Sequence, residues 1–186
     1  MLRINKFRQI VFLSFICAFC ITPLTAFAQT GLERIHERLI KKYDNVEHIS
    51  STEFSEMGAD DLIVFDVRKE KEFAVSHIEG SIRIDPDTEA DEFAAQYADQ
   101  LKGKTVVFYC SVGRRSSALA SRVDSIIESS EATASYNLTG GVFSWRNQER
   151  SLVDQSLEPT TKVHPYNFYT GRLIKDRKAI SYKPSK

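Results

Sequence analysis

The chain has 186 residues, of which 42% are hydrophobic and 27% charged, and its 25 basic side chains are balanced by 25 acidic ones. This composition is that of a folded globular protein. It excludes a disordered chain and a general nucleic-acid binder, because both would carry a strong net charge. The sequence contains no internal repeat and no low-complexity tract.

Residues 1–28 are predicted to be a signal peptide. Three basic residues precede an apolar stretch over residues 10–21, and Ala26-Phe27-Ala28 forms a small-x-small cleavage pattern before Gln29. The alternative is an uncleaved membrane anchor, because the apolar stretch extended to Phe27 approaches the length of a membrane span. The cleavage pattern favours removal. We therefore expect export to the periplasm or the cell exterior, with membrane contact only if the segment stays attached.

Removal of this segment changes both the charge and the thiols of the chain. It takes away three basic residues and no acidic one, which leaves 22 basic against 25 acidic side chains and no case for nucleic-acid binding. It also removes Cys17 and Cys20, so that Cys110 becomes the only thiol. A single cysteine cannot form an internal disulfide in an oxidising compartment, so it stays free for chemistry or for pairing with another molecule. Because no second cysteine is present to resolve a modified Cys110, any acceptor must come from outside.

The remaining length, about 155 residues, is that of one domain. Residues 29–45 are predicted to form a helical extension, because their apolar residues fall on one face of a helix. Ser50 and Glu53 have the spacing of a capping box at the start of a short helix over residues 52–57. Apolar residues at helical spacing also predict a helix over residues 89–101.

A buried strand over residues 62–65 runs directly into Asp66 and Arg68. Open α/β sheets place their sites at this end of a strand, so both side chains are candidates for a functional site. A purely structural alternative is equally open, in which Asp66 turns the chain and Arg68 pairs with Glu70 or Glu72. His77 lies in a turn before the next strand and is expected to fix that turn rather than to act as a base. A general base must lie within hydrogen-bond distance of the thiol, and the sequence does not give that distance.

The stretch around Cys110 organises the chain. An unbroken apolar run over residues 105–109 predicts a buried parallel strand, and helical spacing of apolar residues begins at Ala118. The intervening loop therefore opens onto a helix N-terminus, where free backbone N–H groups favour an anion or a thiolate. We expect the pKa of Cys110 to fall below the free value of about 8.5. Cys110 is the predicted nucleophile, and the predicted anion-binding residues are Ser111, Val112, Gly113, Arg114, Arg115 and Ser116.

The rest of the chain completes an alternating strand and helix pattern from residue 46 to residue 146. A short strand is predicted over residues 134–138, and the glycine pair Gly140 and Gly141 then allows a tight turn before Trp145. This pattern predicts an α/β fold, a mostly parallel sheet with helices on both faces. Residues 150–186 form a basic and aromatic extension, which either wraps its own domain with the aromatic residues as anchors or docks a partner or an anionic surface.

Three segments together resemble the rhodanese (sulfurtransferase) family over roughly residues 46–149, the predicted domain. The loop Cys110-Ser-Val-Gly-Arg-Arg115 has the family's length, with four residues between the cysteine and the closing arginine. Residues 66–82 resemble the first family box and residues 139–145 the second. The resemblance implies the rhodanese α/β fold, a catalytic Cys110, and supporting roles for Asp66 and Arg68. No metal site and no cofactor are expected.

The resemblance implies sulfur transfer by double displacement. The Cys110 thiolate would take the outer sulfur of a small anionic donor, thiosulfate or a polysulfide, and an external thiol, a protein acceptor or cyanide would then remove it. Two alternatives stay open. Related cysteine phosphatases and arsenate reductases use a loop that is one residue longer, so the short loop argues against them. The second is a non-catalytic rhodanese-fold module that carries or binds sulfur, and Cys110 argues against it because a pure binding module would not need a nucleophile there.

Overall fold

The computed structural model describes residues 30–184. The predicted signal peptide of residues 1–28 and its cleavage site before Gln29 lie outside the described residues. Among the helices of residues 30–184, none combines the length and the apolar character needed to cross a bilayer.

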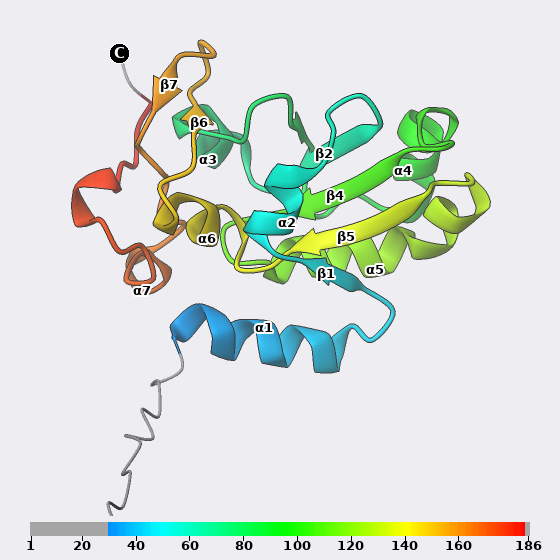
Figure 1. The fold of residues 1–186 in the computed structure, drawn as a ribbon, viewed down its shortest axis with the longest axis horizontal. Coiled ribbons are helices and arrows are strands. Elements are labelled where there is room, and N and C mark those ends of the chain that lie inside the picture. Colours follow the sequence, from blue (N-terminus) through cyan, green and yellow to red (C-terminus); the bar gives the residue numbers. More distant parts are fainter. Residues whose placement is uncertain (1–29, 185–186) are drawn as a thin grey trace, which may run out of the picture.

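A five-stranded parallel sheet forms the centre of the molecule, with the strand order β1-β5-β4-β2-β3 (Figure 1). The central pair is in register over its full length, with Leu62 opposite Thr105 and Asp66 opposite Tyr109. Strands β2 and β4 therefore end at the same edge. The five strands are β1 (Glu47–Ile49), β2 (Leu62–Asp66), β3 (Ile82–Arg83), β4 (Thr105–Tyr109) and β5 (Ala134–Leu138).

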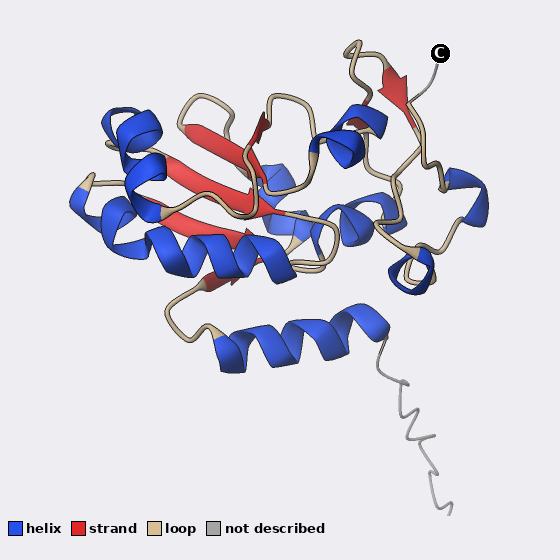
Figure 2. Cartoon of the chain, turned by 180° about the vertical axis from the view of Figure 1, so that it is seen from behind, coloured by secondary structure: helices blue, strands red, loops and turns tan. Residues whose placement is uncertain are grey.

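Helices cover both faces of this sheet, as Figure 2 shows from the side opposite to Figure 1. Successive residues of a strand point to opposite faces. Val107 accordingly packs with α1, α2 and α6, whereas Phe108 packs with α4 and α5. The predicted α/β class, a mostly parallel sheet between helices, is thereby confirmed. The helices are α1 (Gly31–Lys42), α2 (Ser51–Glu56), α3 (Glu70–Val75), α4 (Ala90–Tyr97), α5 (Arg114–Ser129), α6 (Gly141–Asn147) and α7 (Phe168–Gly171).

Local signals set several helix boundaries. The Ser50 hydroxyl accepts the Glu53 N–H and the Glu53 carboxylate accepts the Ser50 N–H, so α2 begins with the predicted capping box. The helix predicted over residues 52–57 lies one residue earlier, at Ser51–Glu56, and two further helices differ from the sequence pattern. The predicted helix over 89–101 ends as α4 at Tyr97 and continues only as the short 3-10 helix Ala98–Gln100. Helix α5 begins at Arg114, one turn before its apolar spacing starts, because a first turn at a site is built from polar residues.

The C-terminal extension packs along its own domain. Strands β6 (Leu152–Val153) and β7 (Pro159–Thr160) form a hairpin, and the short 3-10 helix Arg177–Ala179 lies near the end. The backbones of His77 and Val153 exchange two hydrogen bonds of 2.8 and 2.9 Å, which ties β6 to the domain. This arrangement agrees with the wrapping alternative.

The wrapping alternative named the aromatic residues as the anchors of the extension. The structure shows that other residues hold it. Val163 and Ile174 are almost completely buried in the core cluster that contains α1 and α6. Phe168 and Tyr169, by contrast, are 60% and 77% exposed. They lie on α7, a helix of four residues that is too short to turn a second face toward the domain. Small aliphatic side chains therefore hold the extension, and its aromatic rings line the surface.

Candidate active site

The predicted nucleophile lies at the turn between β4 and α5. Cys110 follows the last residue of β4, and Gly113 is the N-cap of α5 with a φ of 91°. Glycine takes this left-handed conformation without the steric cost that other residues bear. The backbone between them turns tightly enough to bring the first amides of α5 next to the thiol.

The start of α6 fixes the outer side of this turn. The carbonyl oxygens of Cys110 and Ser111 accept hydrogen bonds from the N–H groups of Val142 (2.9 Å) and Phe143 (3.1 Å). So close an approach requires Gly141, because a Cβ at this position would lie 2.2 Å from the Cys110 carbonyl oxygen. With two loop carbonyls bound by α6, the loop amides remain for the sulfur. The glycine pair that the sequence singled out thus shapes the loop directly.

The thiol lies in an environment that favours its ionised form. Burial alone would raise the pKa of Cys110, but the Arg115 charge, the Ser116 hydroxyl and the N–H groups of Ser116 and Val112 outweigh burial and lower that pKa. The Ser116 hydroxyl is buried without another regular hydrogen bond within residues 30–184, so the thiolate is the acceptor available to its proton. Cys110 itself is 1% exposed, so the sulfur is covered by the surrounding residues.

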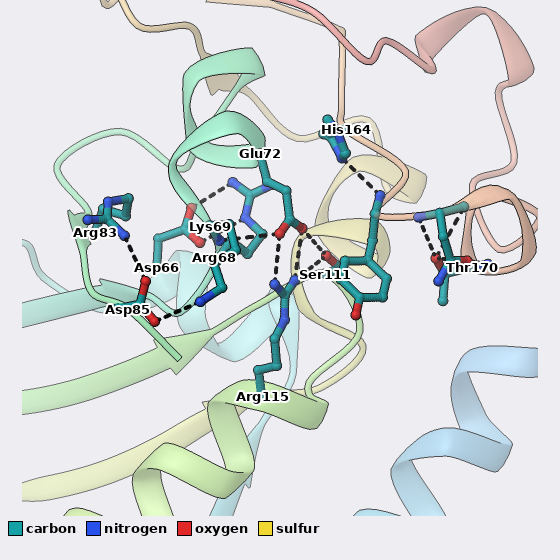
Figure 3. Close-up of polar contacts among 12 residues, drawn as sticks. Asp66, Arg68, Lys69, Glu72, Arg83, Asp85, Ser111, Arg115, His164 and Thr170 are labelled. Atoms are coloured by element: carbon teal, nitrogen blue, oxygen red, sulfur yellow. Dashed lines mark hydrogen bonds and ion pairs between the residues drawn. The ribbon is translucent and has the colours of Figure 1, made fainter. Parts of the chain in front are cut away.

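Arg115 is held beside the sulfur by a buried glutamate. Its two Nη atoms lie 2.7 and 2.8 Å from the two carboxylate oxygens of Glu72, and Nη2 also lies 3.0 Å from the Ser111 hydroxyl (Figure 3). Ser111 in turn donates to Glu72 at 3.0 Å. Burial by itself would raise the pKa of Glu72, yet the hydrogen bonds and charge of Arg115 outweigh burial and lower it. Bidentate pairing of this kind fixes the plane of the guanidinium.

The two adjacent arginines of the loop differ in position. Arg114 is exposed, whereas Arg115 is partly buried and interacts with Cys110 as well as with Glu72. Burial would lower the pKa of Arg115, but these two negative groups outweigh burial and raise it. Arg115 is therefore the cation that faces the thiol. The other predicted loop residues, Ser111, Val112, Gly113 and Ser116, are buried.

Asp66 and Arg68 lie one layer below the loop. Arg68 is fully buried and donates to both oxygens of Asp66, at 2.7 and 2.6 Å, and to the carbonyl oxygen of Ser76 at 2.6 Å. Asp66 also accepts a 2.7 Å hydrogen bond from the hydroxyl of Tyr109, the residue before Cys110. Neither side chain pairs with the thiol. Their geometry is that of a support beneath the loop, and the alternative pairing of Arg68 with Glu70 or Glu72 does not occur.

His77 has a structural environment. Its ring stacks on Phe73 with 3.8 Å between ring centroids, and its Nδ1 lies 3.2 Å from the Phe73 carbonyl oxygen. The ring is buried and sits beside the bridge to Val153. Within residues 30–184, no group of three or more histidine, cysteine or acidic side chains could hold a metal ion.

Sequence reasoning missed two contributors to this site. Glu72 was considered only as a partner of Arg68. Tyr166, from the C-terminal extension, places its ring 4.7 Å from the Arg115 guanidinium, in a cation–π contact. The neighbouring His164 is buried and close enough to Glu72 and Arg115 for their charges to act on it. For Tyr166 and His164 the sequence offers one signal, the aromatic and basic composition of the extension. Composition does not predict which residues they contact.

Comparison with known proteins places this site in a family. A family model described as "Rhodanese-like domain" matches residues 50–148. The tRNA uridine(34) hydroxylase of Bacillus pumilus is 38% identical over 72 residues, which are 37% of this chain and 22% of that protein, so the match spans less than a quarter of the relative.

Solved structures are also similar to this chain. A thiosulfate sulfurtransferase from Pseudomonas aeruginosa superposes with a TM-score of 0.50 and 15% identity, covering 77% of this chain and 26% of that one. A protein from Bacillus halodurans gives a TM-score of 0.49 and 16% identity, covering 75% and 97% of the two chains. At 15% identity the likeness to the Pseudomonas aeruginosa structure concerns the fold alone.

Proposed function

The chain belongs to the rhodanese-like domain family, and from this membership we propose that it is an exported sulfurtransferase that works through a persulfide on Cys110. One observation carries the proposal: the thiol lies against inward-facing amides at the start of α5, with the Arg115 charge beside it. A buried cysteine with a structural role would need neither group. A fixed cation and free amides instead serve a sulfur that carries negative charge.

The first step transfers sulfur from the donor to the enzyme. The Cys110 thiolate attacks the outer sulfur of an anionic donor such as thiosulfate, a bond forms between the two sulfurs, and the sulfur–sulfur bond of the donor breaks. Its electron pair leaves with sulfite. The donor loses a neutral sulfur atom and no external oxidant or reductant is used. The product is a Cys110 persulfide whose outer sulfur carries the negative charge.

The loop then stabilises the charge on the persulfide. The N–H groups of Val112 and Ser116 already lie around the Cys110 sulfur, and donors fixed in advance need no reorganisation when charge moves outward by one atom. Arg115 is oriented by Glu72 and so offers a fixed positive charge to the arriving donor and to the departing sulfite. We assign the anion-binding role to Arg115 rather than to the exposed Arg114.

The second step returns the enzyme to its starting form. An external thiolate or cyanide attacks the outer sulfur of the persulfide, and the Cys110 thiolate leaves. Within residues 30–184 Cys110 is the only cysteine. The acceptor is therefore a separate molecule. The predicted signal peptide of residues 1–28 supports an exported setting for this exchange.

Thiocyanate formation from thiosulfate and cyanide tests the proposal. We expect turnover by the wild-type protein and none by Cys110→Ser, because serine offers no polarisable nucleophile that can carry a persulfide. Hydrolysis of an aryl phosphate should be absent in both proteins. Thiosulfate turnover that survives in Cys110→Ser contradicts the proposal. Cys110-dependent phosphate hydrolysis without sulfur transfer would favour the phosphatase alternative instead.

A further inference from the structure

A pocket of about 470 Å³ lies on the outer side of Arg115. It is bounded by α3, by the first turns of α5, by the loop at Pro86 and by the C-terminal extension. The charged and aromatic residues of its wall are Lys69, Lys71, Glu72, Asp87, Arg115, Arg122 and Tyr166. Arg115 lines this pocket and also interacts with the Cys110 thiolate, so it connects the pocket to the reacting sulfur. The proposed sulfur transfer uses Arg115 but leaves the remainder of the pocket without a role.

Two of the cations in this wall are already neutralised. Lys69 lies 2.9 Å from a carboxylate oxygen of Asp85 and 2.9 Å from one of Asp87. Arg115 is paired with Glu72. Lys69 therefore adds no free positive charge to the pocket, and the charge of Arg115 is shared between Glu72 and the Cys110 sulfur rather than directed at the pocket wall.

The other two cations have no carboxylate partner. Lys71 makes no ion pair and no hydrogen bond through its side chain within the described part of the chain. Arg122 donates only to the carbonyl oxygens of Thr88 at 2.6 Å and Pro86 at 3.4 Å, and these oxygens carry no formal charge. The pocket therefore presents two uncompensated positive charges, from α3 and from α5, and suits a ligand with two negative groups.

Tyr166 closes the side of the pocket that the extension supplies. Its φ of 63° is unusual for a residue other than glycine, and its N–H donates to Nδ1 of His164 at 3.0 Å. This backbone hydrogen bond holds the turn that lays the ring over Arg115. Tyr166 is 48% exposed, so its ring contacts the guanidinium while part of the residue meets solvent.

We propose that this pocket binds the body of the acceptor, an organic thiol with two carboxylates, while its sulfur reaches the Cys110 persulfide past Arg115. The inference rests on the proposed sulfurtransferase function and adds the chemical class of the acceptor. Pockets for organic ligands of several functional groups measure roughly 300–1,000 Å³, and this one falls in that range. Cyanide and sulfite would leave most of it empty.

The transfer balances without a further reactant. The thiolate of the bound acceptor attacks the outer sulfur of the Cys110 persulfide, and a bond forms between these two sulfurs. The bond between the outer sulfur and Cys110 breaks, and its electron pair stays on the Cys110 thiolate. The acceptor leaves as a persulfide anion whose carboxylates were held by Lys71 and Arg122, and Tyr166 keeps Arg115 aligned during the exchange.

Acceptor competition tests this subsite. With thiosulfate as the donor and sulfite release as the readout, kcat/KM per thiolate is measured for mercaptosuccinate, which has two carboxylates, and for 2-mercaptoethanol, which has none. We expect wild type to prefer mercaptosuccinate. Each of Lys71→Gln and Arg122→Gln should lower that preference by about three- to fivefold, the factor of a partly exposed ion pair. The preference should also fall as salt rises, because salt screens exposed charges.

Lys102→Gln provides the matched control. Lys102 is 75% exposed, pairs with Glu131 and precedes β4, so it lies at the opposite end of the sheet from Cys110. The preference of this variant should equal that of wild type. An equal loss in Lys102→Gln and Lys71→Gln, or a wild type that treats both thiols alike, overturns the subsite. Thiocyanate formation is measured on the same proteins. If it occurs without a preference for mercaptosuccinate, only the acceptor subsite is wrong, and if it does not occur, the proposed sulfurtransferase function is wrong.

Tyr166 is tested as a positioning residue. Tyr166→Ala should lower the mercaptosuccinate preference and raise the pH at which Cys110 reacts with iodoacetamide, because Arg115 loses the ring that holds it. Tyr166→Phe keeps the ring and should restore both values. Melting curves establish that the variants are folded. If Tyr166→Ala changes neither the preference nor the alkylation profile in a folded protein, the role given to Tyr166 is wrong.

Discussion

Replacement of Arg115 by glutamine should destabilise the protein because it leaves the buried carboxylate of Glu72 without its cationic partner. Glu72 is fully buried and Arg115 is 21% exposed, and the two share contacts of 2.7 and 2.8 Å. Removal of one partner from a buried pair costs about 3–5 kcal/mol, and the partial exposure of Arg115 places the expected loss in the free energy of unfolding near the lower end, at about 3 kcal/mol. For a chain of this size the loss corresponds to a melting temperature lower by about 6–12 °C.

The loss of stability in Arg115→Gln should depend on pH through the ionisation of Glu72. In wild type the pKa of Glu72 is lowered, so its contribution is present at neutral pH and is lost as the pH falls through the folded-state pKa. In Arg115→Gln burial is opposed only by the Arg68 charge and the Ser111 hydroxyl, so the pKa of Glu72 should rise relative to wild type, and protonation in acid should offset part of the loss in stability. The melting difference between the two proteins should therefore narrow from pH 7 to pH 5. The double variant Arg115→Gln with Glu72→Gln should melt above the single variant.

Thermal melts followed by circular dichroism measure this prediction. A single variant that melts within about 2 °C of wild type at pH 7 would show that the ion pair contributes little to the free energy of unfolding, since about 1 kcal/mol corresponds to at least that shift. A double variant less stable than the single one would show that the Glu72 carboxylate is not stranded. Either result refutes the reasoning.

Three further predictions concern Ser116, His48 and the C-terminal extension. Ser116→Ala should raise the pKa of Cys110 and slow its alkylation by iodoacetamide at pH 7, with a stability change within about 1 kcal/mol, and unchanged alkylation would remove Ser116 from the site. Burial and the nearby His36 lower the pKa of His48 from 6.5 to about 4, so wild type should lose stability as the pH falls between these values, and His48→Gln should lose less of it in urea titrations. Deletion of residues 160–186 should lower the melting temperature, because aliphatic side chains of this segment are buried in the core, and an unchanged melting temperature would contradict the wrapping.

The sheet and the loop could be predicted because their signals are local. Buried parallel strands are continuous apolar runs, and the run over 105–109 is the strand that carries Cys110. The glycine pair at 140 and 141 marks a close approach of backbones, and the structure brings α6 against the loop carbonyls there. Signals between residues close in sequence thus predict the position of Cys110 at the end of β4 and the helix that packs against its loop.

The partners of the loop could not be predicted because they come from distant parts of the chain. A glutamate on a helix is ordinarily exposed, and the burial of Glu72 follows only from Arg115, 43 residues further on. Neighbouring residues of a helix differ in direction by about 100°, so the choice between Arg114 and Arg115 depends on the residue at which α5 begins. The contact of Tyr166 depends on the path of an extension beyond the family domain.

Intact-mass analysis after exposure to thiosulfate tests the central claim most directly. The wild-type protein should gain the mass of one sulfur atom, the gain should map to Cys110, and subsequent addition of a thiol or cyanide should remove it. Cys110→Ser should gain nothing under the same conditions. A wild-type protein that stays unmodified with thiosulfate and with polysulfide, or a sulfur that Cys110→Ser also acquires, would contradict the persulfide mechanism.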